Sequence, residues 1–314
     1  MNSPQVIEGM IQTLDLNFCG FAGAIAAYLI PHSQGAVLVE CGPGSTVPAL
    51  EAALKLHGLN TGDITDVLLT HIHLDHAGAA GWLARLGARI HVHPVGAPHL
   101  KNPEKLLTSA ARIYGDSMQT LWGDFLPVPE DHLLTHENNE VIEIEGLRFR
   151  ALDTPGHAYH HYCYLYEGVC FSGDIGGVRL GRACHLRLPM PPPEFNLELW
   201  RESIHRLQTE YDLGAFQQIA PTHFGLFDDP AWHLKAANQA LNDVEGWILQ
   251  VMPANPSTEE LKEMFNHWTQ ERSLQYGLDP ELLGPFEVAN PSWMSAYGIH
   301  RYWHKVRNAP QAGD

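Results

Sequence analysis

Apolar positions in the first third of the chain fall into short runs or alternate with polar ones, a pattern that predicts β-strands. The runs are bounded by glycine, proline or polar residues, which end strands. An apolar run without alternation is typical of a strand buried on both faces. The predicted strands lie at residues 5–14, 22–30, 36–40, 67–69 and 90–92.

Helical spacing and turn residues organise the next part of the chain. The turn at 41–44 leads into a helix whose N-cap is Ser45 or Thr46. Glycine-containing turns inside alternating segments predict β-hairpins. We therefore predict helices at 78–86, 103–123 and 196–211, hairpins at 140–152 and 161–172, and a strand ending at Ala220.

The pattern changes after residue 227, where strand signals largely stop. Helices are predicted at 230–252 and 257–275, and Ser257 with Glu260 three positions later forms a capping-box pattern. We predict two parts of the chain: a main α/β domain at 1–227 and a helical C-terminal extension at 228–314.

One long segment without periodicity interrupts the main domain. Residues 176–194 are irregular and end in the proline-rich stretch 189–193. A stiff loop of this length inside a compact domain often forms a lid or a binding wall. A purely structural connector is the alternative.

The charge of the chain argues against some partners. With 19 Lys+Arg against 36 Asp+Glu the net charge is −17. Because phosphate backbones are bound by lysine and arginine, we expect no nucleic acid partner.

Other features of the sequence bear on the compartment. No run reaches the ~18 apolar residues of a membrane span, and the N-terminal stretch lacks signal-peptide features. The five cysteines contain no C-x-x-C pair. We therefore expect a cytoplasmic protein with reduced thiols and no membrane partner.

Four potential metal ligands crowd into one turn directly after the strand predicted at 67–69. In THIHLDHAG (70–78) the pattern H-x-H-x-D-H consists of His71, His73, Asp75 and His76. Three further clusters also follow predicted strands, where the loops of an α/β sandwich gather ligands. They contribute His157 in TPGH, Asp174 in SGD and His223 in THFG.

The chemistry of these seven groups indicates two metal ions. Imidazole and carboxylate are suitable ligands for zinc and related first-row metals. Seven groups are too many for one tetrahedral ion, but they suit two ions that share a bridge. Alternation points His71 and His73 the same way, which leaves Asp75 and His76 for a second ion. Asp174 can serve as the bridge because a carboxylate has two oxygens.

The motifs and their order resemble those of the metallo-β-lactamase-fold hydrolases, including the glyoxalase II branch, over roughly residues 5–227. The segment VECGPG (39–44) is similar to the family's acidic glycine turn, although Cys41 stands where threonine or serine is expected. The resemblance implies a four-layer αββα sandwich. It also implies a dinuclear metal-dependent hydrolase that uses a metal-bridging hydroxide to cleave a lactone, ester, thioester or phosphoester of a small molecule.

Carried over to this sequence, the resemblance implies two metal positions with three ligands each and one shared ligand. The first position takes His71, His73 and His157, and the second takes Asp75, His76 and His223. Asp174 bridges them, and Asp75 also orients the nucleophile or passes a proton. The cofactors implied are two divalent metal ions, zinc first, with iron, manganese or cobalt as alternatives.

Departures from the family's patterns separate its branches. Asp174 stands where the best-known β-lactamases carry cysteine, which disfavours antibiotic hydrolysis. Gly177 stands where homoserine-lactone hydrolases usually carry a tyrosine that polarises the substrate. A lactonase is therefore possible, but it would lack this tyrosine. Arg179, Arg182 and Arg187 lie where glutathione thioesterases carry basic residues, but in a different pattern. A mononuclear iron sulfur dioxygenase on the same fold is the alternative to a hydrolase.

Candidate contacts to the small-molecule substrate are harder to identify, and packing is the alternative role for each. The candidates are His160, Arg179, Phe224 and Trp293. The helical extension either caps the pocket or forms a homodimer interface, and its aromatic residues between 293 and 303 are the reason to consider both.

Overall fold

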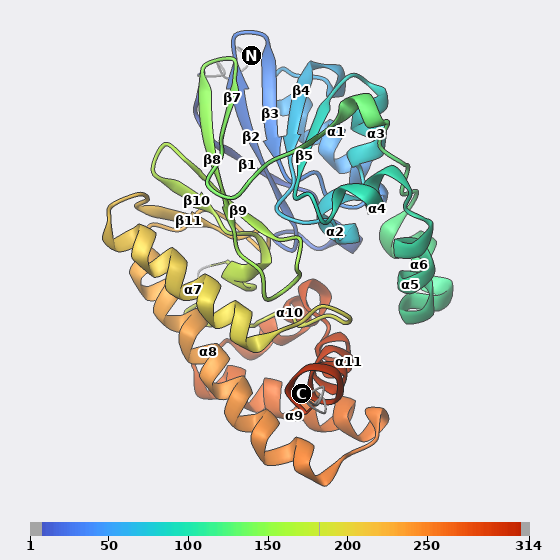
Figure 1. Cartoon of the computed structure of the whole chain (residues 1–314), viewed down its shortest axis with the longest axis vertical. Coiled ribbons are helices and arrows are strands. Elements are labelled where there is room, and N and C mark those ends of the chain that lie inside the picture. Colours follow the sequence, from blue (N-terminus) through green and yellow to red (C-terminus); the bar gives the residue numbers. More distant parts are fainter. Residues whose placement is uncertain (1–7, 182, 309–314) are drawn as a thin grey trace, which may run out of the picture.

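Two β-sheets form the centre of the molecule. The computed structural model describes residues 8–181 and 183–308 (Figure 1). The first sheet has the strand order β1-β2-β3-β4-β5-β6, with bounds Gln12–Asp15, Ala26–His32, Gly35–Val39, Ile64–Leu68, Arg89–Val92 and Leu133–Thr135. The second has the order β11-β10-β9-β8-β7, and β7 to β11 span Val141–Ile144, Leu147–Asp153, Tyr162–Tyr166, Val169–Phe171 and Gln218–Ala220.

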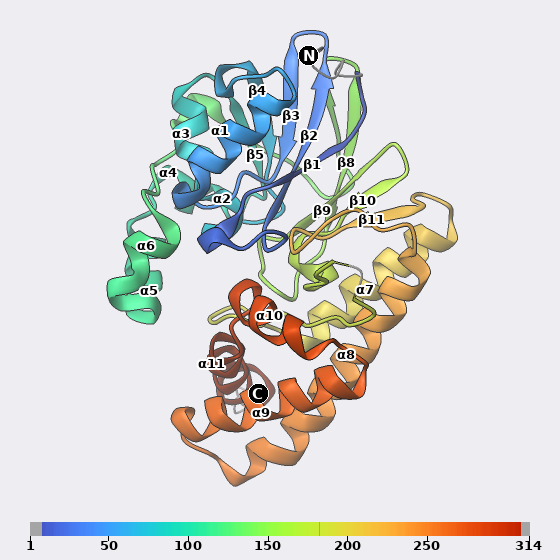
Figure 2. The ribbon, with the colours of Figure 1, turned by 180° about the vertical axis from the view of Figure 1, so that it is seen from behind.

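Helices cover the outer face of each sheet, as the two opposite views show (Figures 1 and 2). On the first sheet lie α1 (Val47–Leu56) and α3 (Ala80–Arg85), and on the second lie α7 (Leu197–Asp212) and α8 (Pro230–Val251). The shorter helices of the main domain are α2 (Leu74–Ala77), α4 (Ala97–Lys101), α5 (Glu104–Tyr114) and α6 (Met118–Trp122). The chain continues through α9 (Thr258–Gln275), α10 (Leu283–Ala289) and α11 (Ser292–Tyr302).

Strand alternation builds three separate layers of core. In β3, Leu38 packs under α1, whereas its neighbour Val39 packs between the two sheets. In β9, Tyr164 packs between the sheets and Leu165 packs under α7. Successive side chains of a strand point to opposite faces, so each inner strand supplies two cores. The predicted four-layer αββα sandwich is confirmed.

Several local predictions differ from the structure. The metal-ligand turn was expected to be a loop, but α2 begins inside it at Leu74, before the predicted helix at 78–86. The helix predicted at 103–123 is divided into α5 and α6 by a tight turn at 115–117, where Gly115 has φ +52°. The short elements α4 and β6 were not predicted. Part of the strand predicted at 5–14 lies outside the described residues.

The C-terminal helices share one core with the second sheet. Ser257 and Glu260 exchange the two hydrogen bonds of a capping box at the start of α9, as predicted. Trp247 of α8 and Ile299 of α11 belong to the same buried cluster as Trp200 of α7 and Leu165 of β9. The division at residue 228 therefore follows a change in secondary structure but crosses a continuous core.

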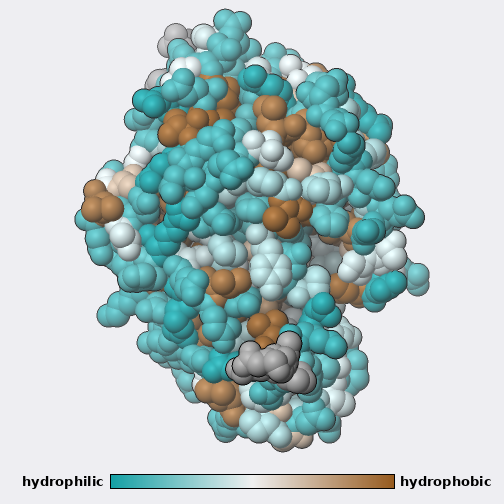
Figure 3. Space-filling model, in the orientation of Figure 1, coloured by the Kyte–Doolittle hydropathy of each residue, from teal (hydrophilic) through white to brown (hydrophobic). Residues whose placement is uncertain are grey.

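The surface gives little sign of a large apolar face. In the view of Figure 3 hydrophilic side chains predominate and hydrophobic ones form small separate groups. Among the described helices, none combines the length and apolar composition needed to cross a bilayer. All five cysteines are free thiols.

The irregular loop 176–194 is held against the C-terminal helices by close packing. The backbone of Met190 donates to Ser295 Oγ of α11 at 3.2 Å. Gly298 lies so close that a Cβ atom there would stand 1.8 Å from the Met190 carbonyl oxygen. Further back in the loop, His185 and Arg187 both contact Ser273 of α9. The loop is thus fixed between the sandwich and the helical extension.

A Gly298→Ala substitution tests this close approach. Helix propensity alone would make the change stabilising, but the clash with the Met190 carbonyl should lower the free energy of unfolding by about 1–3 kcal/mol. Gly246→Ala on α8 is the matched control, since no atom lies within 4 Å of its Cβ position; it should stabilise by about 0.5–1 kcal/mol. Urea unfolding measures both, and two stabilising results would contradict the packing.

Acid should destabilise the loop anchor through His185. Burial, then Arg272 and Arg187, lower the pKa of His185 from 6.5 to about 3. Between these values the unfolded chain binds a proton that the folded chain does not, so stability falls as pH drops, by at most about 1.4 kcal/mol per pH unit. His185→Gln should flatten the curve of unfolding free energy against pH between 6.5 and 4.5. The exposed control His205→Gln should keep the wild-type slope, and equal slopes for all three proteins would refute the assignment.

Candidate metal centre and its cavity

The seven side chains predicted as metal ligands come together at one edge of the sandwich. His71 and His73 follow β4, and α2 presents its two ligands one turn further on. The other three follow β8, β10 and β11, so every contributing loop leaves the end of a strand. The carboxyl ends of strands are where an α/β sandwich gathers functional groups. The seven are His71, His73, Asp75, His76, His157, Asp174 and His223.

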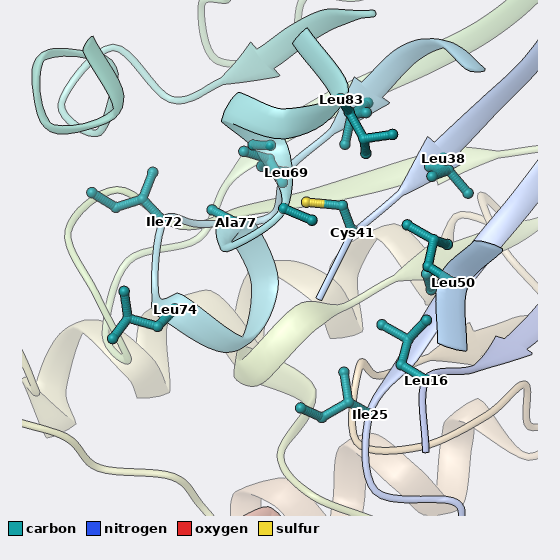
Figure 4. Packing of buried hydrophobic residues seen from close by; sticks show 14 of the residues in the cluster. Leu16, Ile25, Leu38, Cys41, Leu50, Leu69, Ile72, Leu74, Ala77 and Leu83 are labelled. Carbon is teal, nitrogen blue, oxygen red and sulfur yellow. The ribbon is translucent and has the colours of Figure 1, made fainter. Parts of the chain in front are cut away.

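Apolar residues between the ligands fix the turn (Figure 4). Ile72, Leu74 and Ala77 are buried in the core under the first sheet, alongside Cys41. The Cys41 amide and thiol both donate to the carbonyl of His76, each at 3.1 Å. Burial of the apolar positions therefore orients the polar ones toward the junction of the sheets.

Three imidazole nitrogens converge in the first cluster. His73 Nδ1 lies 2.9 Å from His71 Nε2 and 2.8 Å from His157 Nε2. The third distance, between His71 Nε2 and His157 Nε2, is 3.1 Å. His157 Nδ1 donates to the Pro189 carbonyl at 2.7 Å, so its Nε2 carries a lone pair. His71 Nδ1 similarly faces Thr70 Oγ1 at 3.0 Å. Lone pairs directed at one another at this distance fit a cation such as zinc, which binds such nitrogens at about 2.0–2.1 Å.

The second cluster is built from α2 and the loop after β11. His223 Nε2 lies 3.4 Å from Asp75 Oδ2, and His76 Nε2 lies 3.7 Å from Asp75 Oδ1. His223 Nδ1 donates to the Ala24 carbonyl at 2.7 Å, which leaves its Nε2 as an acceptor. His76 Nε2 is buried and makes no hydrogen bond within the described part of the chain. This donor set also fits a metal ion.

Asp174 joins the two clusters. Its Oδ2 lies 3.3 Å from His157 Nε2 of the first cluster, and its Oδ1 lies 3.4 Å from His76 Nε2 and 3.6 Å from His223 Nε2 of the second. The carboxylate is buried, and Oδ1 has no hydrogen-bond partner among the described residues. Each oxygen thus faces a different cluster, which is the arrangement of a bridging ligand.

Burial keeps the first cluster neutral. It lowers the pKa of His71 well below the usual range, and the neighbouring imidazoles of His76 and His73 add to this. It also lowers the pKa of His157 to about 3, although the charge of Asp174 acts in the opposite direction. Neutral imidazole is the form that binds metal at pH 7.

The carboxylates remain ionised in spite of burial. Burial raises the pKa of Asp75, but His76 and His223 outweigh it and lower the value to about 2. The pKa of Asp174 is likewise held well below its usual range. Burial lowers the pKa of His76, yet Asp174 and Asp75 raise it well above the ordinary value. The second cluster therefore attracts positive charge, which a dication supplies in place of a proton.

Glu40 supports both clusters and was not singled out from the sequence. Its buried Oε1 accepts from the Thr70 hydroxyl, from Thr222 Oγ1 at 3.1 Å and from His76 Nδ1 at 3.1 Å. Since Thr70 in turn faces His71, one carboxylate orients a ligand of each cluster. The acidic glycine turn VECGPG (39–44) contains this residue, but the sequence pattern gives Glu40 no role in supporting the ligands.

The clusters open into a cavity of about 330 Å³. Five of the seven ligands line it, and its walls are mostly apolar. One wall comes from α5 and α6, another from the loop 189–193 and a third from α10 and α11. Tyr114 of α5 and Trp293 of α11 meet across it, with ring centroids 5.8 Å apart. The loop is therefore a cavity wall, and the helical extension closes the cavity from one side.

Of the four candidate substrate contacts, Trp293 lines the cavity and the other three do not. Arg179 binds Asp229 through two nitrogens, at 2.6 and 2.8 Å, and its guanidinium stacks on Phe227 and Trp232. His160 lies behind the first cluster with its Nε2 3.3 Å from Glu194. Phe224 packs against the cores on both faces of the first sheet.

Comparison with known proteins adds the family context. A sequence model described as the metallo-beta-lactamase superfamily matches residues 20–210. A metallo-beta-lactamase fold-containing protein of Sulfurisphaera tokodaii is 30% identical over 144 residues, which cover 45% of this chain and 54% of that protein. A hydroxyacylglutathione hydrolase of Aeromonas hydrophila is 32% identical over 149 residues, which cover 47% and 44%. The chain thus spans about half the length of these relatives.

Solved structures show the same fold. An archaeal metallo-beta-lactamase superfamily protein from Sulfolobus tokodaii aligns with a TM-score of 0.60 and 23% identity over 74% of this chain and 86% of its own. A metallo-beta-lactamase family protein from Thermus thermophilus aligns with a TM-score of 0.59 and 23% identity over 93% of this chain and 92% of its own. The second alignment is long enough to include C-terminal helices.

Glu40→Gln should weaken metal binding without removing a predicted ligand. Glutamine lacks the charge that holds His76 and Thr70, and loss of such a supporting partner typically costs about 10–100-fold in metal affinity. Competition with a fluorescent zinc chelator measures the effect. Glu263→Gln, at an exposed position of α9, is the control and should bind as the wild type does. Equal affinities for all three proteins would show that Glu40 does not support the centre.

Proposed function

Because the chain belongs to the metallo-beta-lactamase superfamily, we propose that it is a dinuclear metal-dependent hydrolase that cleaves an ester-type bond of a small molecule. The observation that carries the proposal is Asp174, whose two oxygens face two separate ligand clusters. Two of the relatives are named hydroxyacylglutathione hydrolases, which supports a hydrolytic activity. Two metal positions joined by one carboxylate suit hydrolysis better than chemistry that needs one ion.

The side chains of the centre have different roles. When bound, two dications lower the pKa of a shared water and polarise the oxygen of the substrate. The imidazoles of both clusters hold their ring orientation through hydrogen bonds from the opposite nitrogen. Asp75 lines the cavity and its Oδ2 lies 3.4 Å from His223 Nε2, so its carboxylate is placed to orient an attacking water by accepting a hydrogen bond.

The cavity walls favour an uncharged, largely hydrocarbon group next to the reacting bond. No lysine or arginine is among the described residues that line the cavity. Arg187, one of the arginines considered for glutathione, binds Glu287 at 2.6 Å, and Arg179 is occupied by Asp229. Arg182 lies outside the described residues. Among ester-type substrates, esters, thioesters or lactones with an apolar acyl group fit these walls better than phosphoesters, which carry more charge.

The second cluster also favours this activity over that of a mononuclear iron sulfur dioxygenase. One iron would need only the first cluster. Asp75, His76 and His223 would then remain a buried acidic group with donor atoms directed at one another and no ion. Burial of such groups without a partner is costly, so the complete set favours two metals.

Metal removal tests the proposed function. The purified protein should contain about two first-row metal ions per chain, and chelation should abolish hydrolysis of aryl esters. Reloading with zinc, manganese or iron should restore activity to different extents. His71→Ala should lose one metal and lower kcat/KM for p-nitrophenyl esters by at least about a thousandfold. His205→Ala, an exposed histidine on α7, should match the wild type.

Three results would overturn the proposal. The first is a single bound iron together with sulfite formation from a persulfide. The second is full activity of the His71→Ala variant. The third is the absence of turnover of all esters, thioesters, lactones and phosphotriesters by every metal form.

A further inference from the structure

A second hollow adjoins the apolar cavity and has a different chemistry. It is a surface groove of about 380 Å³ between α5 and the C-terminal end of α11. Two arginines, one lysine and two histidines line it, and no acidic side chain is among its described lining residues. The five are Arg112, His300, Arg301, His304 and Lys305. Arg112, Arg301 and Lys305 thus bring three formal positive charges together in a chain whose net charge is −17.

The cations of this groove form no ion pairs with the residues that the structure describes. Arg112 and Lys305 form no salt bridge with any residue in the described part of the chain, and both are exposed. Arg301 donates from Nε to the Pro193 carbonyl at 3.1 Å, which leaves its terminal nitrogens free of carboxylates. By contrast, Arg307 one to two turns further on is paired with Glu198 and Glu245. Unpaired cations gathered in a hollow attract an anionic group.

The groove borders the catalytic cavity, and the two hollows share part of their walls. Ile113 and Pro192 line both hollows. Along α5, Arg112 lies in the groove and Tyr114 lies in the cavity. Along α11, Trp293 lies in the cavity and His300 lies in the groove, about 10 Å further along the helix axis at 1.5 Å per residue. On both helices an aromatic side chain thus lines the cavity and an arginine lines the groove, Tyr114 and Arg112 on α5, and Trp293 and Arg301 on α11.

From this continuity we infer that the substrate is an amphipathic anion. Its reacting carbonyl lies at the metal centre, an apolar segment of about 10 Å fills the cavity, and a terminal carboxylate or phosphate binds in the groove. This inference rests on the proposed function. In the reaction, the acyl C–O or C–S bond breaks, water supplies the oxygen of the new carboxylate, and one of its protons goes to the leaving group. The anionic end is unchanged and serves to position the chain.

A matched series of substrates tests the inference. The probes are p-nitrophenyl esters of ten-carbon acids whose far end is a methyl, a carboxylate or a phosphate group. At low salt, an anionic end should raise kcat/KM by at least about tenfold over the methyl end, and 0.5 M NaCl should remove most of that gain. Whichever of the carboxylate and the phosphate gives the larger increase in kcat/KM is the preferred anion. Equal or better turnover of the methyl-ended ester would overturn the inference.

Charge reversal in the groove tests whether its cations cause the preference for anionic substrates. The double substitution Arg112→Glu with Lys305→Glu should reduce the ratio of kcat/KM for anionic over methyl-ended esters by at least about tenfold, mainly through KM. Lys55→Glu, an exposed lysine at the end of α1, is the control for a charge reversal outside the groove and should keep the wild-type ratio. A double variant with the wild-type ratio would place the anion elsewhere and refute the assignment.

A binding measurement separates this inference from the proposed function. Isothermal titration of metal-loaded protein with decyl phosphate and with decanoate should show weaker binding to the double variant than to the wild type. If no ester is hydrolysed by any metal form but this difference is found, the groove assignment stands and the hydrolase proposal fails. If esters are hydrolysed but both proteins bind the two probes equally, the groove assignment fails alone.

Discussion

The convergence of seven donor groups, five buried and two partly buried, at one edge of the sandwich is the constraint on which the rest of the structure depends. Imidazole lone pairs meet within 3.1 Å, and a buried carboxylate oxygen has no hydrogen-bond partner in the described structure. Such an arrangement is unfavourable in a dry interior unless cations occupy it. The supporting hydrogen bonds to Pro189, Ala24 and Glu40 fix which nitrogen of each ring faces inward. The folded chain therefore holds these groups in an arrangement that suits metal binding, and this arrangement needs no substrate.

The sandwich alone does not enclose this centre. The loop 176–194 and the helices after β11 complete the cavity, and they do so by close backbone packing at Gly298 and by buried contacts of His185 and Arg187. Because α11 and α5 approach each other through Trp293 and Tyr114, the extension determines the shape of the space above the ligands. The extension therefore shapes the cavity although it carries none of the seven ligands.

Charged groups differ between the metal centre, the core and the groove beside the cavity. Two buried carboxylates, Glu40 and Asp174, lie at the candidate metal centre, and the buried arginines of the described structure have acidic partners such as Asp229 and Glu287. The groove between α5 and α11 departs from this rule, because its cations are left without acidic partners among the described residues. An overall negative protein with one cationic groove beside its cavity can guide an anionic molecule to that entrance through its electrostatic field.

The sequence by itself determined the ligand types, their order and the layer arrangement. These depend on local rules: H-x-H-x-D-H places its ligands within one turn, and alternation in β3 and β9 decides which face each side chain joins. Only the tertiary structure decided that Arg179 is occupied by Asp229 and that Glu40 supports both clusters. It also brought Trp293 next to Tyr114, residues 179 positions apart. Partners so distant in sequence are chosen by the packing of whole elements, and no local pattern encodes that choice.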